Sequence, residues 1–194
     1  MTQPRSLILL LSGWAHSGKD SVAKILVESY EFQKLAFADP IKQRVAKEQD
    51  IPLEWCYDQT KKSEPLPSGS RTLREELIRV GEEGRKENTG FWAQQIGEKI
   101  LKSSSRGQRR FIISDWRILD ELWTLQKLCP EMLIVPVRIE RPSQLVSPVP
   151  DPTEYGLLGF PFRYTLHNIG SLARLFEQTV AFVEDDLSKV WTQK

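Results

Sequence analysis

The sequence predicts an α/β fold in which a mostly parallel sheet carries helices on both faces. Short apolar runs alternate along its 194 residues with segments of helical periodicity. The run at 7–11 is continuously apolar, as is typical of a strand covered on both faces, and a glycine-containing turn joins it to the next helix. A length near that of one average domain predicts a single domain over 1–194.

The remaining elements follow the same two patterns. Apolar runs predict further strands at 35–38, 111–114, 132–137 and 164–167. Helical spacing predicts helices over 22–30, 40–49, 72–80, 91–101, 118–128 and 171–190. Proline, glycine and polar residues predict loops at 57–71 and 81–90 and a long proline-rich excursion at 138–163.

The charge balance excludes a global field that would attract nucleic acid or an anionic membrane. Lys and Arg number 27 against 26 Asp and Glu, which leaves a formal charge of +1. Two cysteines far apart and two histidines predict neither a disulfide framework nor a zinc site, and no apolar run approaches the length of a membrane span. We therefore expect a cytoplasmic protein whose anion site is built locally, with no nucleic-acid or membrane partner.

Residues 13–19 (GWAHSGK) match the pattern G-x-x-x-x-G-K between a strand and a helix, which is the context of a phosphate-binding loop. Backbone N–H groups and the helix N-terminus would hold phosphate oxygens, and the Lys19 ammonium would reach the terminal phosphates of ATP. The alternative is a glycine turn with an exposed lysine. The predicted ATP-binding residues here are Gly13, Ala15, His16, Ser17, Gly18, Lys19, Asp20 and Ser21.

The residue after Lys19 is Asp20, where this pattern usually has Ser or Thr, and the hydroxyl is displaced to Ser21. A carboxylate there would hold Mg²⁺ through water, or would act only as an acid that stabilises the helix dipole. Both Asp20 and Ser21 are therefore candidate magnesium ligands.

Asp115 and Arg117 follow the strand at 111–114, at the edge of the sheet where open α/β folds bind ligands. Asp115 is a candidate for magnesium or substrate, and Arg117 would face phosphates. The alternative is that Asp115 caps the following helix while Arg117 is solvated.

Taken in order, a set of short strings resembles the deoxynucleoside monophosphate kinases of bacteriophages and large viruses. The resemblance covers nearly the whole chain, and its strings are 12–20, 36–42, 62–67, Arg74 with Gly81, 84–85, Trp92, 114–117, 141–142 and 168–171. The phosphomevalonate kinases of animals are also similar, especially across 17–20, 40–42, 78–85 and 114–115.

These resemblances imply a P-loop fold with a five-stranded parallel sheet, a substrate-binding region at about 39–100 and a lid at about 138–163. Arg74 and Arg85 would be brought together by a glycine-rich turn at 81–84. The implied acceptor-site residues are Asp39, Lys42, Arg74, Arg85, Trp92, Asp115 and Arg117, although Trp92 also suits core packing. The resemblance adds Asn168 and Arg141 to the ATP site, and it makes Lys19, Arg117 and Arg141 the catalytic residues.

The sequence thus predicts transfer of the γ-phosphoryl group of ATP–Mg²⁺ to the 5′-phosphate of a nucleotide, in the host cytoplasm if the protein is viral. The acceptor is already an anion, so positioning and electrostatic stabilisation would suffice. Two alternatives are phosphomevalonate as the acceptor, and a nucleotide-binding module that phosphorylates no small molecule. The sequence does not determine whether the protein forms a homodimer.

Overall fold

The computed structural model describes residues 5–69, 71–142 and 155–191. Its sheet has five parallel strands in the order β2-β3-β1-β4-β5. The strands are β1 (Leu7–Ser12), β2 (Gln33–Leu35), β3 (Arg110–Ile113), β4 (Leu133–Glu140) and β5 (Tyr164–His167). All five therefore end at one edge of the sheet, and the predicted five-stranded parallel sheet is confirmed.

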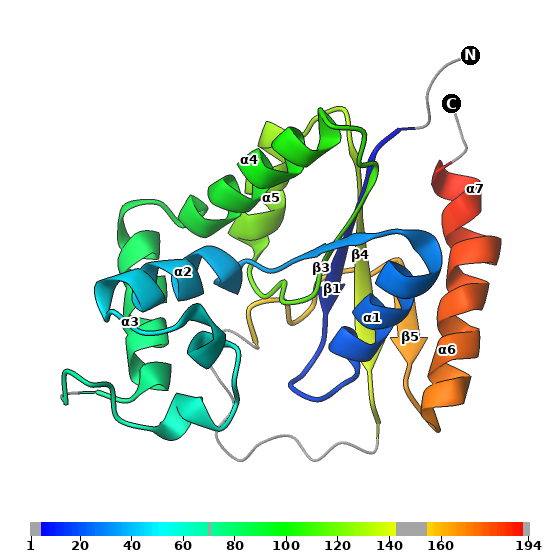
Figure 1. Cartoon of the computed structure of the whole chain (residues 1–194). Coiled ribbons are helices and arrows are strands. Elements are labelled where there is room, and N and C mark those ends of the chain that lie inside the picture. The colour runs from blue at the N-terminus through cyan, green and yellow to red at the C-terminus, as the bar shows by residue number, and fades with distance from the viewer. Residues whose placement is uncertain (1–4, 70, 143–154, 192–194) are drawn as a thin grey trace.

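Two apolar cores lie on the two faces of this sheet because successive side chains of a strand point to opposite sides. Leu7, Leu9 and Leu11 of β1 face α1 (Lys19–Tyr30), α6 (Leu172–Ala181) and the π-helical segment η4 (Phe182–Leu187). Ile8 and Leu10 face α4 (Phe91–Ser104) and α5 (Leu119–Leu128). Figure 1 shows the resulting three layers, with α1 and α6 on one side of the strands and α4 and α5 on the other.

A third, smaller core belongs to a region that projects beside the sheet. The region consists of α2 (Ala38–Glu48), the 3₁₀ turns η1 (Leu53–Cys56) and η2 (Lys61–Ser63), and α3 (Leu73–Glu87), and its core also includes Trp92 of α4. In Figure 1 these elements lie to the left of the sheet and below α4. The resemblance placed the substrate-binding region here.

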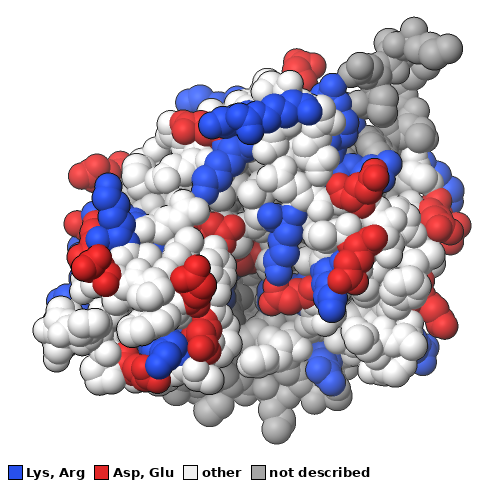
Figure 2. All heavy atoms as spheres, in the orientation of Figure 1, with Lys and Arg blue, Asp and Glu red and all other residues white. Residues whose placement is uncertain are grey.

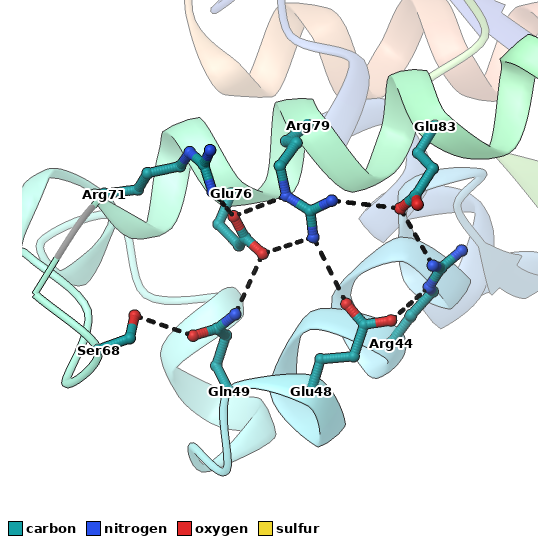
Figure 3. A network of polar contacts seen from close by, with 8 residues as sticks. All are labelled: Arg44, Glu48, Gln49, Ser68, Arg71, Glu76, Arg79 and Glu83. Atoms are coloured by element: carbon teal, nitrogen blue, oxygen red, sulfur yellow. Dashed lines mark hydrogen bonds and ion pairs between the residues drawn. The ribbon is translucent and has the colours of Figure 1, made fainter.

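An ion-pair network fixes α2 against α3 (Figure 3). Its centre is Glu76, only 2% exposed, which accepts hydrogen bonds from Arg79 at 2.7 and 2.9 Å and from Gln49 at 3.1 Å. The paired guanidinium of Arg79 holds the pKa of Glu76 below its usual value. The residues drawn are Arg44, Glu48, Gln49, Ser68, Arg71, Glu76, Arg79 and Glu83. Because buried charges must be paired, this network ties the orientations of the two helices together.

The predicted loop at 81–90 is wrong over 81–87, which are helical. Helix α3 begins at a capping box formed by Thr72 and Glu75 and continues through 81–84 to Glu87. Gly84 serves close packing, because the Trp92 indole lies against it, and the Nε1 of that indole donates to the Gly81 carbonyl at 2.9 Å. Arg74 and Arg85 therefore lie on one helix, and no glycine turn joins them.

Two other boundaries differ from prediction. The strand expected at 35–38 is β2 at Gln33–Leu35, because the chain at 36–38 already turns into α2. The helix expected over 171–190 is α6, η4 and a short α7 (Ser188–Trp191).

None of the helices in the described ranges is both long and apolar enough to cross a bilayer. Figure 2 shows basic and acidic side chains interspersed over the visible face, in keeping with the near-zero formal charge.

Candidate active site

The phosphate-binding loop joins β1 to α1 at the carboxyl edge of the sheet, at the lower end of β1 in Figure 1. Gly18 is the N-cap of α1 with a φ of 110°, a conformation that favours glycine, and no side chain caps this helix. A Cβ on Gly13 would collide with the backbone carbonyl of Ile139. The N-terminus of α1 therefore keeps its backbone donors for a ligand, and the loop needs its glycines.

The Lys19 ammonium lies over this loop and donates to the carbonyls of Gly13 and Trp14 at 2.7 and 2.8 Å. Ser17 Oγ is buried and has no hydrogen-bond partner in the part of the chain that the structure describes. A positive charge, an orphaned hydroxyl and an uncapped helix end in one loop fit a polyphosphate group. When bound, ATP would supply the phosphoryl group, held by this loop and Lys19.

Asn168 lies behind the loop. Its Nδ2 donates to the Ser17 carbonyl at 3.0 Å, and its backbone N–H donates to Glu140. A Cβ on Gly18 would approach that Nδ2 to 2.7 Å. The side chain of Asn168, which was predicted as an ATP-binding residue, therefore holds the backbone of the phosphate-binding loop at Ser17.

Asp20 projects from the first turn of α1 and is bound by Lys34 of β2 at 2.6 Å. Ser114 Oγ, at the end of β3, lies 3.5 Å from the same carboxylate oxygen. Burial acts to raise the pKa of Asp20, but the hydrogen bond and charge of Lys34 and the charge of Lys19 outweigh it and lower that pKa. The carboxylate is thus ionised next to the phosphate-binding loop.

No cluster of three or more His, Cys, Asp or Glu side chains that could hold a metal is present among the described residues. Magnesium commonly keeps several waters and binds through one or two carboxylates together with substrate phosphates. The ionised Asp20 and the neighbouring Ser21 fit that mode, in which the metal would neutralise charge on the phosphates.

Asp115 joins the end of β3 to the start of α2. Its two carboxylate oxygens accept the backbone N–H groups of Phe37 at 2.8 Å and Ala38 at 2.9 Å. Burial raises the pKa of this carboxyl despite the two hydrogen bonds. Asp115 therefore caps a helix, as the alternative interpretation held, but the helix is α2 and not the one that follows it in sequence.

The first turn of α2 presents Asp39 and Lys42 next to Tyr57, which follows η1. The Tyr57 hydroxyl donates to Asp39 at 2.9 Å, and the Lys42 ammonium lies 3.9 Å from the Tyr57 ring centroid. Burial and the bond to Asp39 raise the pKa of Tyr57 to about 12, so its hydroxyl stays a donor at neutral pH. Tyr57 is 47% exposed and places an aromatic ring beside a cation.

Further cations converge on the same region. Lys42, Arg74 and Arg117 lie within electrostatic range of Lys62, which was not among the predicted site residues. The charge of Arg117 also acts on the Asp115 carboxyl, and the charge of Arg85 acts on the buried Glu121 carboxyl. Lys42, Arg74 and Arg117 therefore lie around Lys62, whereas Arg85 lies beside Glu121.

Trp92 is the exception among the predicted acceptor-site residues. It is 2% exposed in the core between α2, α3 and α4, where its ring packs on Gly84. The structure gives it the packing role that was weighed against substrate contact.

The region predicted as a lid is described only in part, and 143–154 lie outside the described residues. Arg141 is exposed directly after β4. Phe160 and Phe162 pack edge-on against Trp116, with ring centroids 5.0 and 5.7 Å away. Tyr155 stacks edge-on with Trp14 of the phosphate-binding loop at 5.2 Å, so this end of the predicted lid contacts the loop.

Arg138 is a second residue that sequence reasoning missed. It pairs in register with Ser12, donates to that residue's Oγ at 3.3 Å, and its guanidinium lies 5.9 Å from the Trp14 ring centroid. It was missed because the strand was predicted to end with its apolar run at 137, whereas β4 continues to Glu140.

Comparisons with known proteins agree with this arrangement. A family model described as phosphomevalonate kinase matches residues 11–131. No curated protein matches the sequence at a significant level.

Solved structures show the fold. TT1252 from Thermus thermophilus is similar with a TM-score of 0.54 at 19% identity, over 94% of this chain and 98% of that chain. A sugar kinase from Janibacter sp. HTCC2649 has a TM-score of 0.51 at 13% identity, over 98% and 100%. A putative kinase from Chloroflexus aurantiacus J-10-fl has a TM-score of 0.50 at 13% identity, over 94% and 98%.

The matched segment contains the phosphate-binding loop, α2, α3 and the end of β3, and it spans more than half of the chain. The protein has a P-loop kinase fold, and the chain belongs to the phosphomevalonate kinase family.

Proposed function

We propose that the protein transfers the γ-phosphoryl group of ATP to the 5′-phosphate of a nucleoside monophosphate, preferably a deoxynucleotide. The observation that carries the proposal is the pairing of two anion sites at one edge of the sheet. Lys19 and the N-terminus of α1 form one, and the cations of α2, α3 and the end of β3 form the other.

The two sites are joined through β3. Ser114 lies 3.5 Å from Asp20 on the donor side, and Asp115 next to it caps α2, which carries the acceptor-side residues. An acceptor phosphate and the γ-phosphate of ATP would thus be held by neighbouring parts of one rigid edge. Two polyanions repel unless cations screen them, and phosphoryl transfer needs mainly positioning and charge stabilisation.

In the proposed reaction, an oxygen of the acceptor phosphate attacks the γ-phosphorus and the bond to the bridging oxygen of ADP breaks. Lys19 would stabilise charge on the donor, while Arg117 would lie on the acceptor side. We keep Arg141 as a catalytic candidate next to the donor because it directly follows β4. Magnesium, held through Asp20 and Ser21, would offset the phosphate charge.

The exposed Tyr57 ring favours a nucleotide. It lies against Lys42 and Asp39, within the cation group, where a planar base could stack and a carboxylate could accept a hydrogen bond. The resemblance of nearly the whole chain to deoxynucleoside monophosphate kinases supports the same acceptor class.

Phosphomevalonate is the second candidate acceptor, and the family match favours it. It carries a carboxylate as well as a phosphate, so a site with several cations suits it too. The third interpretation, binding of nucleotide without transfer, requires that no acceptor be phosphorylated.

The test is a coupled ADP-release assay with ATP and Mg²⁺ on each deoxy- and ribonucleoside monophosphate and on phosphomevalonate. Mass spectrometry would identify each product. We expect ADP and a nucleoside diphosphate in equal amounts from at least one nucleotide. Turnover with phosphomevalonate alone would establish the second candidate, and ATP binding without any product would refute both acceptors.

A further inference from the structure

Lys62 has an unusual position for a lysine. It lies on η2, which packs against η1 and α3, and its side chain is partly buried. Within the described ranges, no hydrogen bond or ion pair of Lys62 is formed. A partly buried ammonium without a carboxylate partner is costly, so its retention needs an explanation.

The charges closest to Lys62 make this cost larger. Burial is the main cause that lowers its pKa, and the positive charges of Lys42, Arg74 and Arg117 lower it further. These cations come from α2, α3 and the segment after β3, so three separate parts of the chain contribute positive charge around Lys62. The Asp39 carboxylate lies 4.0 Å from the Lys42 ammonium and accepts hydrogen bonds from Tyr57 and Ala36, and the Asp115 carboxylate accepts hydrogen bonds from the start of α2.

The adjacent Lys61 shows what a structural lysine looks like on the same turn. Its ammonium is paired with both carboxylate oxygens of Glu64, at 2.9 and 3.1 Å, and lies 5.2 Å from the Trp55 ring centroid. Lys61 is paired with a carboxylate on its own turn, whereas the charges that act most on Lys62 are those of the cations Lys42, Arg74 and Arg117. Lys61 therefore has a local structural role, and Lys62 is the one of the two that suits a ligand.

We propose that Lys62 is a direct ligand of the acceptor phosphate, and that with Lys42, Arg74 and Arg117 it selects a phosphomonoester dianion over uncharged acceptors. This inference rests on the proposed function and deepens it. Four cations from separate elements suit a compact dianion, because each can approach a different face of the phosphate. An uncharged acceptor such as a sugar hydroxyl would bring no negative charge to this group of cations.

The experiment compares Lys62→Gln with Lys61→Gln in the full-length chain, using the acceptor identified by the assay above. We expect Lys62→Gln to raise the KM for the acceptor about 10- to 100-fold, since hydrogen bonds between charged groups contribute about 1.5–3 kcal/mol. The KM for ATP should change less than about twofold. Lys61→Gln should leave both constants near the wild-type values, and Lys62→Arg should retain part of the acceptor affinity.

A second measurement separates ligand binding from a role in folding. Without ligand, Lys62→Gln should unfold at the same temperature as the wild type or higher, because it removes repulsion among like charges. Inorganic phosphate at millimolar concentration should stabilise the wild type and Lys61→Gln more than Lys62→Gln.

The outcomes distinguish the two levels of the argument. If the wild type phosphorylates no monophosphate ester, the proposed function fails. If it does so and Lys62→Gln keeps the wild-type acceptor KM, or loses stability without ligand, the assignment of Lys62 is overturned while the proposed function stands.

Discussion

Substituting alanine for Gly84 tests how the acceptor region is built. Gly84 lies inside α3, and a Cβ placed there would be 2.6 Å from Trp92 Cζ2 and 2.9 Å from Phe91 Cδ1. The indole cannot easily retreat, because it is 2% exposed and its Nε1 donates to the Gly81 carbonyl. The added methyl group must therefore push α3 away from α4 or break that hydrogen bond.

Two opposing effects set the magnitude. Alanine is favoured over glycine inside a helix by about 1 kcal/mol. Overpacking of a core costs about 1–3 kcal/mol, and a lost hydrogen bond that leaves buried groups unpaired costs about 1–3 kcal/mol more. We expect Gly84→Ala to lower the free energy of unfolding by about 2 kcal/mol, which corresponds to a fall in Tm of about 4–8 °C for a chain of this size.

Gly81→Ala is the matched control. It lies one turn earlier in the same helix, and a Cβ there would meet Ile41 Cδ1 at 3.4 Å, an ordinary contact. The helix preference should then dominate, and stability should be unchanged or raised by up to about 1 kcal/mol. Urea unfolding followed by circular dichroism measures both variants. Equal stability of the two variants would refute the packing role assigned to Gly84.

Two further predictions concern the edge of the sheet. Burial raises the pKa of Glu121 to about 8, while its unfolded value is near 4.5, so the folded state binds the extra proton and the free energy of unfolding falls as the pH rises from about 5 to 8. Glu121→Gln should flatten this pH dependence in urea titrations at several pH values. A pH dependence like that of the wild type would contradict the shift. Asn168→Ala removes the donor to the Ser17 carbonyl, so we expect a KM for ATP raised about tenfold with the acceptor KM unchanged, and parallel changes in both constants would speak against a role confined to the donor loop.

The sequence predicts the sheet and the phosphate-binding loop well because both depend on local patterns. A continuous apolar run gives β1, and the glycines and Lys19 that follow lie within one turn of the chain. The five-stranded parallel sheet, implied by resemblance, is confirmed. The resemblance to phosphomevalonate kinases is confirmed at the level of the family, and the nucleotide acceptor stays a prediction.

The sequence predictions fail where the role of a residue depends on a contact with a residue far away in the sequence. Gly81 and Gly84 predict a turn by composition, but both lie inside α3, where Gly84 packs against the indole of Trp92 and the Gly81 carbonyl accepts its N–H. Asp115 caps a helix that begins 77 residues earlier, which no local pattern reveals. In the sequence Lys62 is one of several loop lysines, and only the fold shows that three other cations lie near it.

The central claim is that Lys19 and the N-terminus of α1 bind the polyphosphate of ATP. Isothermal titration with a non-hydrolysable ATP analogue and Mg²⁺ tests it on the wild type, on Lys19→Ala and on Lys24→Ala, an exposed lysine of the same helix. We expect a single site in the wild type and in Lys24→Ala, and at least tenfold weaker binding in Lys19→Ala with the fold intact. Equal affinity in all three proteins would contradict the claim.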